Sequence, residues 1–124
     1  MAVISATISA IPGQGNIAGY RVLWSAILTS PNNTGSVIQF PDFSDRSVQI
    51  SGTMGSGGTI IIEGTNDGVT FNTLSDANGN ALSKTVTGIF AITEATIGIR
   101  PQVTVGDSTT SCTVAAYFRK TAQP

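Results

Sequence analysis

The 124-residue chain contains no histidine and only one cysteine. Without histidine it lacks the commonest general base, the usual zinc ligand and every Ser-His or Cys-His nucleophile pair. The single Cys112 has no partner for a disulfide within the chain, which is compatible with synthesis in a reducing cytoplasm. The sequence holds no catalytic constellation, so we expect no enzymatic activity and no cofactor or metal.

Charged residues are also scarce, at 10% of the chain against roughly 25% in ordinary soluble domains. The net charge is −1 and neither sign forms a run. Nucleic acid is not an expected partner, because its binding requires a basic stripe that neutralises phosphates. No membrane contact is expected either. No apolar run reaches the roughly 18 residues of a membrane-spanning helix, and the first residues lack the basic region of a signal peptide.

What the sequence does contain is the pattern of short β-strands. Residues 47–74 predict three strands joined by two turns, and the remaining chain is expected to pack against this meander. Val48 and Ile50 alternate with polar residues, which is the period of a strand with one buried face. Gly55–Gly58 predicts a hairpin turn because glycine adopts positive φ angles easily, and Asn66–Gly68 predicts a second turn.

Further strands follow the same pattern over 20–28, 36–40, 81–86, 89–93, 97–105 and 112–119. Pro101 lacks a backbone donor and therefore predicts an edge position or a bulge. About eight or nine strands with turns every 8 to 12 residues or so, and no helical window, predict an antiparallel β-sandwich. A jelly roll is the first choice and an immunoglobulin-like sandwich the alternative.

The N-terminal residues 1–19 differ from the rest of the chain. They are small or β-branched, and Pro12 and three glycines interrupt them. We interpret them as an extended arm that lies along the domain or reaches a neighbour, with a frayed terminus as the alternative. Residues 20–124 are predicted to form a single β-sandwich domain, since the whole chain is too short for two ordinary domains.

Two groups of acidic residues are candidates for a functional site, one catalytic and one for calcium. Glu63 and Glu94 are the only glutamates and could form the carboxylate pair of a glycosidase, but each is expected as an exposed strand residue. Residues 76–80, DANGN, resemble a calcium loop in the spacing of their oxygen-bearing side chains. They lack the flanking helices and the bidentate glutamate, so a turn stabilised by its own Asp and Asn side chains is the favoured interpretation.

Aromatic residues and the cysteine are expected mainly in the core. Trp24, Tyr20 and Phe71 could form a stacking platform for a sugar, although in a small β-sandwich such residues are more often core. Cys112 alternates with apolar residues along the last strand and is predicted to be a small buried residue.

Residues 46–120 resemble a known protein family. The segment VQISGTMGSGGTIIIEGTNDGVTFNTL, its continuation DANGNALSKTV and the final IGIRPQVTVGDSTTSCTVAAYFRK are similar to small head decoration (cement) proteins of tailed bacteriophages. The most specific features are the EGTNDG turn and the IRP step. Phe71 stands where these proteins often have tryptophan, which keeps the packing role.

This resemblance implies a structural virion protein. Such a protein would be made in the host bacterial cytoplasm and bind the outer surface of the assembled head, with the major capsid protein and further copies of itself, as a dimer or trimer, as partners. An extended arm can add a strand to a neighbour's open sheet edge. We therefore expect contacts from the arm and the 30–45 region, with these candidates: Val3, Ile4, Ile8, Ile11, Pro12, Asn32, Asn33 and Phe43.

A similar pattern of strands and turns also occurs in galactose-binding-like jelly rolls. The alternative hypothesis is therefore a phage tail or receptor-facing module that binds surface glycan. It predicts an exposed aromatic cluster around Trp24 or the turns of residues 66–80.

Overall fold

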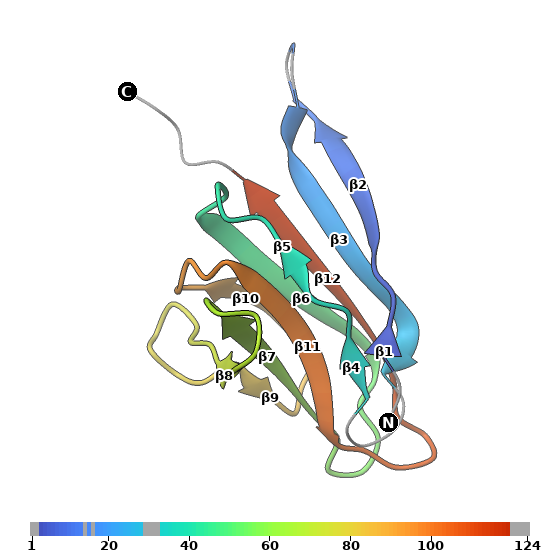
Figure 1. The fold of residues 1–124 in the computed structure, drawn as a ribbon. Coiled ribbons are helices and arrows are strands. Elements are labelled where there is room, and N and C mark those ends of the chain that lie inside the picture. The colour runs from blue at the N-terminus through green and yellow to red at the C-terminus, as the bar shows by residue number, and fades with distance from the viewer. Residues whose placement is uncertain (1–2, 14, 16, 29–32, 120–124) are drawn as a thin grey trace.

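The computed structural model describes residues 3–13, 15, 17–28 and 33–119, and the side chains of residues 25–28 lie outside this description. Within those ranges the chain forms β-strands β1 to β12 and no helix. The strands build two sheets that enclose one core (Figure 1). The predicted all-β sandwich is thus confirmed, and the choice between jelly-roll and immunoglobulin-like connections stays a prediction.

The first sheet has seven strands centred on β11 (Gly98–Val105). On one side β11 pairs antiparallel with β7 (Thr59–Thr65), and on the other with two-residue strands. The remaining members are β1 (Val3–Ile4), β4 (Thr34–Gly35), β5 (Ile38–Gln39), β8 (Asn72–Thr73) and β9 (Ser83–Lys84). Every outer strand of this sheet is therefore very short.

The second sheet has five longer strands in the order β10-β6-β12-β3-β2, and its consecutive pairs are antiparallel. Their bounds are β2 (Thr7–Pro12), β3 (Ile17–Leu28), β6 (Asp45–Thr53), β10 (Gly88–Ile92) and β12 (Ser111–Arg119). The central strand β12 places Tyr117 opposite Arg21 on β3 and Ser47 on β6. Residues in one such row share a face of the sheet because side chains alternate along each strand.

The core lies between the sheets and is filled mainly by aliphatic side chains. Cys112 is fully buried there, as predicted from its alternation with apolar residues. Trp24 is 1% exposed, and its Nε1 donates a hydrogen bond to the Ser36 carbonyl oxygen over 3.1 Å. Its ring lies so close to Gly35 that a Cβ added there would come within 2.5 Å of it. The buried hydrophobic residues are Ile4, Val22, Trp24, Val48, Ile50, Ile60, Ile62, Leu74, Leu82, Ile92, Ile99, Val103, Cys112, Val114, Ala116 and Phe118.

Two turns of the predicted meander have different outcomes. The Asn66–Gly68 turn joins β7 to its antiparallel partner β8, which confirms that part of the prediction. The hairpin predicted at Gly55–Gly58 is wrong, because β6 and β7 belong to different sheets. Gly55 and Gly57 do adopt positive φ angles. The turn carries the chain from one sheet to the other, a path that local sequence does not distinguish from a hairpin.

The prediction for Pro101 is also wrong. Pro101 lies opposite Ile62 inside the seven-stranded sheet, and the register shift of β11 falls later, between Val103 and Val105. On the other side of β11, β5 pairs as far as Ile99 and β4 pairs at Gln102. Pro101 therefore lies between two short strands, at a position where its missing N–H is tolerated.

The described residues of the segment 1–19 lie along the domain. β1 pairs with β4 in one sheet, and β2 pairs with β3 in the other. The hairpin of β2 and β3 crosses the boundary placed after residue 19. Contact between this segment and a neighbouring molecule stays a prediction.

Candidate binding face

The five-stranded sheet turns one face to the core and the other to solvent. On β6, Val48 and Ile50 are buried, while Ser47 and Gln49 point outward. The outward set, called here the outer face, consists of Thr7, Ser9, Ile11, Arg21, Leu23, Ser47, Gln49, Ser51, Ile89, Ala91, Thr113, Ala115 and Tyr117. Arg21 is the only charged residue of this set, and the other members are polar uncharged, aliphatic or aromatic.

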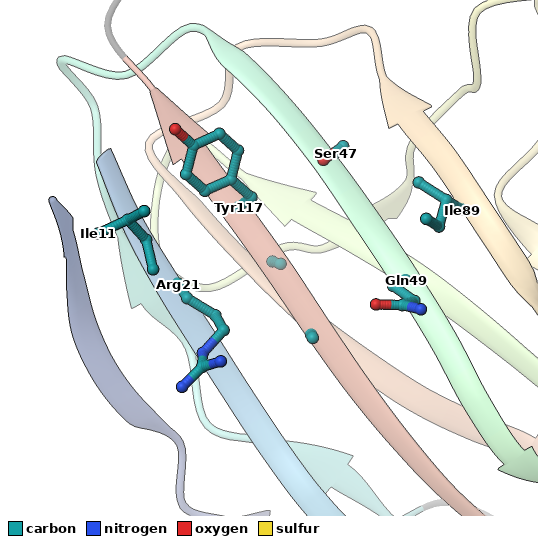
Figure 2. A pocket seen from close by; sticks show the side chains of 8 residues that line it. Ile11, Arg21, Ser47, Gln49, Ile89 and Tyr117 are labelled. Atoms are coloured by element: carbon teal, nitrogen blue, oxygen red, sulfur yellow. The ribbon is translucent and has the colours of Figure 1, made fainter. Parts of the chain in front are cut away.

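A shallow hollow of about 230 Å³ lies on the outer face. Figure 2 shows Ile11, Arg21 and Tyr117 on one side of it and Gln49 and Ile89 on the other. Ala115 on the central strand adds only a methyl group to the lining, which also includes Ser47 and Ala116. The hollow exists because short side chains on β12 are flanked by longer ones on its neighbours.

The position of the Tyr117 ring depends on Gly19. A Cβ built on Gly19 would lie 2.9 Å from Cε1 of Tyr117 and 2.4 Å from the carbonyl oxygen of Phe118. The ring thus covers the backbone of β3 beside Arg21, where any larger residue would displace it. Tyr117 is half-buried, so a large aromatic surface remains accessible at the hollow.

Arg21 is the one charge near the centre of the outer face. In the described part of the chain its guanidinium forms no hydrogen bond or ion pair. At one end of the same sheet, Arg119 pairs with Asp45, and this hydrogen bond raises the pKa of Arg119. The lining of the hollow therefore includes the exposed Ile89, the Tyr117 ring, the Gln49 amide and the Arg21 cation. Together these groups can bind an apolar or aromatic ligand group that carries one anionic or hydrogen-bond acceptor atom.

A second, more polar cleft of about 510 Å³ lies beside the turn between β7 and β8, with Asp67 and Glu94 in its lining. Both carboxylates are engaged locally. Oδ1 of Asp67 accepts hydrogen bonds from the N–H groups of Thr70 and Val69, which help to lower its pKa to about 2. Oε1 of Glu94 accepts a hydrogen bond from the Ser75 N–H over 2.8 Å. These acceptors stabilise turns, and the geometry assigns them no further role.

The two glutamates considered as a catalytic pair have separate partners. Glu63 is buried and forms an ion pair with Nε of Arg100 over 3.1 Å. Its predicted exposure is therefore wrong, because the ion pair and the surrounding strands cover it. Glu94 is half-buried and lies in the loop after β10, not in a strand.

The loop that resembles a calcium site is held by its own hydrogen bonds. Oδ1 of Asp76 accepts from the N–H groups of Asn78 and Asn80 over 2.9 and 3.0 Å. Oδ2 pairs with Nζ of Lys84 over 2.9 Å, and this contact is the main cause of the lowered pKa of Asp76. Among the described residues, no group of three His, Cys, Asp or Glu side chains could hold a metal ion.

The three aromatic residues considered as a sugar platform lie apart. Trp24 is buried in the core. Tyr20 stacks on Phe40 with ring centroids 5.4 Å apart. Phe71 is covered by the Arg100 guanidinium, whose carbon lies 3.7 Å from the ring centroid. The exposed cluster predicted around Trp24 is thus wrong, because the indole ring packs between the sheets and finds its acceptor there.

The contact residues predicted from sequence are divided between surface and core. Val3 and Ile8 are 64% and 51% exposed, and Pro12 is exposed as well. Ile11 lines the hollow. Ile4, at 8% exposed, and Asn33 are buried, and Phe43 is half-buried against Tyr20 and Phe40. Asn32 lies outside the described residues.

Sequence reasoning missed Arg21, Gln49, Ile89 and Tyr117, which line the hollow with Ile11. A signal for part of this set was present. Once Cys112, Val114 and Phe118 are assigned to the core, alternation places Tyr117 on the opposite face. The order of the strands, which brings Ile11 and Ile89 to the same face from distant parts of the chain, could not be inferred in this way.

Comparisons with known proteins give little further information. No protein-family model matches the chain, and no curated protein matches it. Among solved structures, the chain is similar at 11% identity to the N-terminal cellulose-binding domain from Cellulomonas fimi β-1,4-glucanase C. That alignment covers 96% of this chain and 80% of that domain with a TM-score of 0.22, a likeness too slight to carry an argument. No helix among the described residues could span a membrane.

Proposed function

We propose that this chain is a structural virion protein, a head decoration protein that binds the outer surface of an assembled phage capsid through the outer face. The sequence resemblance over residues 46–120 suggests the class of protein, and the composition of the outer face carries the proposal. A sheet face that holds one unpaired charge, Arg21, loses little hydration energy on docking. Tyr117 and Arg21, opposite each other in register, are residue types that often dominate binding energy.

The major capsid protein is the proposed partner, and stabilisation would follow from mass action. A protein that binds assembled subunits but not separated ones adds its binding free energy to the assembled state. This stabilisation needs no chemical step. The protein would then act at the capsid surface after synthesis in the host cytoplasm.

Co-sedimentation with empty phage heads tests this proposal. We expect saturable binding of the native protein and a large loss of binding for Ala115→Arg, because the added side chain would fill the hollow. The matched control is Ala95→Arg, which adds the same charge at an exposed loop position. Equal binding by both variants would contradict docking through the outer face, and no binding by the native protein would contradict the decoration function.

A second candidate function is glycan binding by a tail or receptor-facing module. The observation that favours it is the half-buried Tyr117 ring beside Arg21 and Gln49, since sugars stack on aromatic rings and hydrogen-bond to such polar groups. A screen of surface polysaccharides with native protein and Tyr117→Ala separates the two functions. Glycan binding that Tyr117→Ala abolishes, together with no binding to heads, would favour the module over the decoration protein.

A further inference from the structure

The edges of the two sheets differ in a way that has consequences for association. The seven-stranded sheet ends on the two-residue strands β1 and β8. The five-stranded sheet ends on longer strands, with the six residues of β2 at one side. No described strand lies beyond β2, whose free edge is turned to solvent in Figure 1. A long open edge offers unpaired N–H and C=O groups to another strand.

β2 has few of the features that usually prevent edge pairing, and its one register shift against β3 lies at its end, between Ile11 and Pro12. It has no charged side chain, and its only proline, Pro12, is its last residue. Ile8 is 51% exposed on this strand. The nearest charged residue along the chain after β2 is Arg21, on the neighbouring strand. Proteins normally block such an edge with lysine, a central proline or a strong bulge, so an open and uncharged edge is suited to pairing.

The absence of charge on β2 suits a second copy of the same strand as the partner. When a strand pairs with its own copy about a two-fold axis, residues near the axis meet themselves, and any charge there would face a like charge. β2 meets this condition over its whole length. From these observations we infer that β2 pairs antiparallel with β2 of a second copy, which joins two five-stranded sheets into one continuous sheet.

The register follows from the position of the proline. Directly opposite residues share a face, so the axis passes beside a residue that faces itself, either Ser9 or Ala10. Pairing centred on Ser9 places Thr7 opposite Ile11 and Ile8 opposite Ala10 without using Pro12, which has no N–H to donate. Pairing centred on Ala10 would place Pro12 opposite Ile8. Ser9 is therefore the central residue.

This arrangement has a geometric consequence for the proposed function. A two-fold axis that makes identical edge strands antiparallel stands perpendicular to the sheet, so both outer faces point the same way. The dimer then presents two hollows to one surface. The inference itself concerns the isolated protein and does not depend on binding to heads.

The test is the oligomeric state of the purified full chain by sedimentation velocity. We expect the native protein to be a dimer that dissociates on dilution, and Ser9→Lys to be a monomer because two lysines would meet at the axis. The matched control Ser51→Lys places the same charge on β6, away from the edge, and should remain a dimer. Circular dichroism and thermal unfolding would establish that both variants are folded.

Two results would overturn the inference: a monomeric native protein at the highest attainable concentration, or a folded Ser9→Lys variant that remains a dimer. If Ser9→Lys fails to fold, Ser9→Cys takes its place. Oxidation should then cross-link two copies, while the native protein should not cross-link because Cys112 is fully buried. Absence of a cross-linked dimer would count against pairing at β2. None of these results bears on whether the protein binds heads.

Discussion

Arg46 shows how much of this fold can depend on one buried side chain. The residue is 4% exposed, and its guanidinium donates hydrogen bonds to the carbonyl oxygens of Phe40, Phe43 and Thr96 over 3.1, 2.7 and 2.6 Å. Burial lowers the pKa of Arg46, and none of the ion pairs within the described residues involves it. Carbonyl dipoles from two loops, and the face of Phe118, take the place of a carboxylate.

We predict that Arg46→Met lowers the free energy of unfolding by about 3 kcal/mol, because it removes the hydrogen bonds that the guanidinium donates to the two loops. Arg46→Lys should recover only part of this loss, since a single ammonium group cannot reach both loops. Chemical denaturation measures both values. Arg21→Met, at an exposed position, should change stability by less than about 0.5 kcal/mol. Equal effects at the two arginines would contradict this role of Arg46.

Asp67 gives a prediction about acid stability. Hydrogen bonds, chiefly from the Thr70 N–H, lower its pKa from an ordinary 3.8 to about 2. A depressed pKa in the folded state adds stability that is complete above the unfolded pKa and is lost as the pH falls toward about 2. The melting temperature of Asp67→Asn should therefore lie below that of the native protein near neutral pH and converge with it in acid.

Thermal unfolding across this range of pH is the measurement, and Asp42→Asn, at an exposed turn position, is the control. The native protein should itself lose stability over the same range, because hydrogen bonds from Thr109 and Ser56 also lower the pKa of Asp107 to about 2. A constant difference in melting temperature between native and Asp67→Asn at all pH values would show that the Asp67 charge is not responsible.

At the scale of the elements, the contact between β3 and β4 depends on a glycine. A Cβ at Gly35 would lie 2.5 Å from Cδ1 and Nε1 of Trp24 and 2.6 Å from Cδ of Pro101. Gly35→Ala should therefore destabilise the protein by about 1–3 kcal/mol through overpacking. Combining it with Trp24→Phe, which makes room, should cost less than the sum of the two single changes. Strictly additive values from denaturation would contradict the predicted clash.

At the scale of the elements, the sequence could predict which face of a strand is buried but not which strands pair. Period-two alternation correctly gave the buried faces around Val48 and Cys112, because side-chain direction is a local property of a strand. Alternation does not say which strands pair. The glycine turn at 55–58 therefore looked like a hairpin although it joins two sheets, and Pro101 looked like an edge residue although β11 is central.

For the molecule as a whole, the candidate site could be predicted only in part. Ile11 was among the expected contact residues and lines the hollow, but Arg21, Gln49 and Tyr117 come from three other strands. Their meeting depends on the order β6-β12-β3-β2, which is set by contacts between distant parts of the chain. Ile4 and Asn33 were also expected to be contact residues, but both are buried. The strand pairing that buries them joins distant parts of the chain, so it could not be predicted from the residues next to them in the sequence.

The central position of β12 also bears on how the protein is made. β12 joins β3 to β6, yet it is the last described strand to be synthesised. Before β12 has been made, the hairpin of β2 and β3 and the pair of β6 and β10 have no strand between them. The sheet can close only after Arg119 has left the exit tunnel, and this closure is expected to be slow, as for other non-local β topologies. Until then the edges of β3 and β6 that β12 will cover are unpaired, which exposes the nascent chain to aggregation.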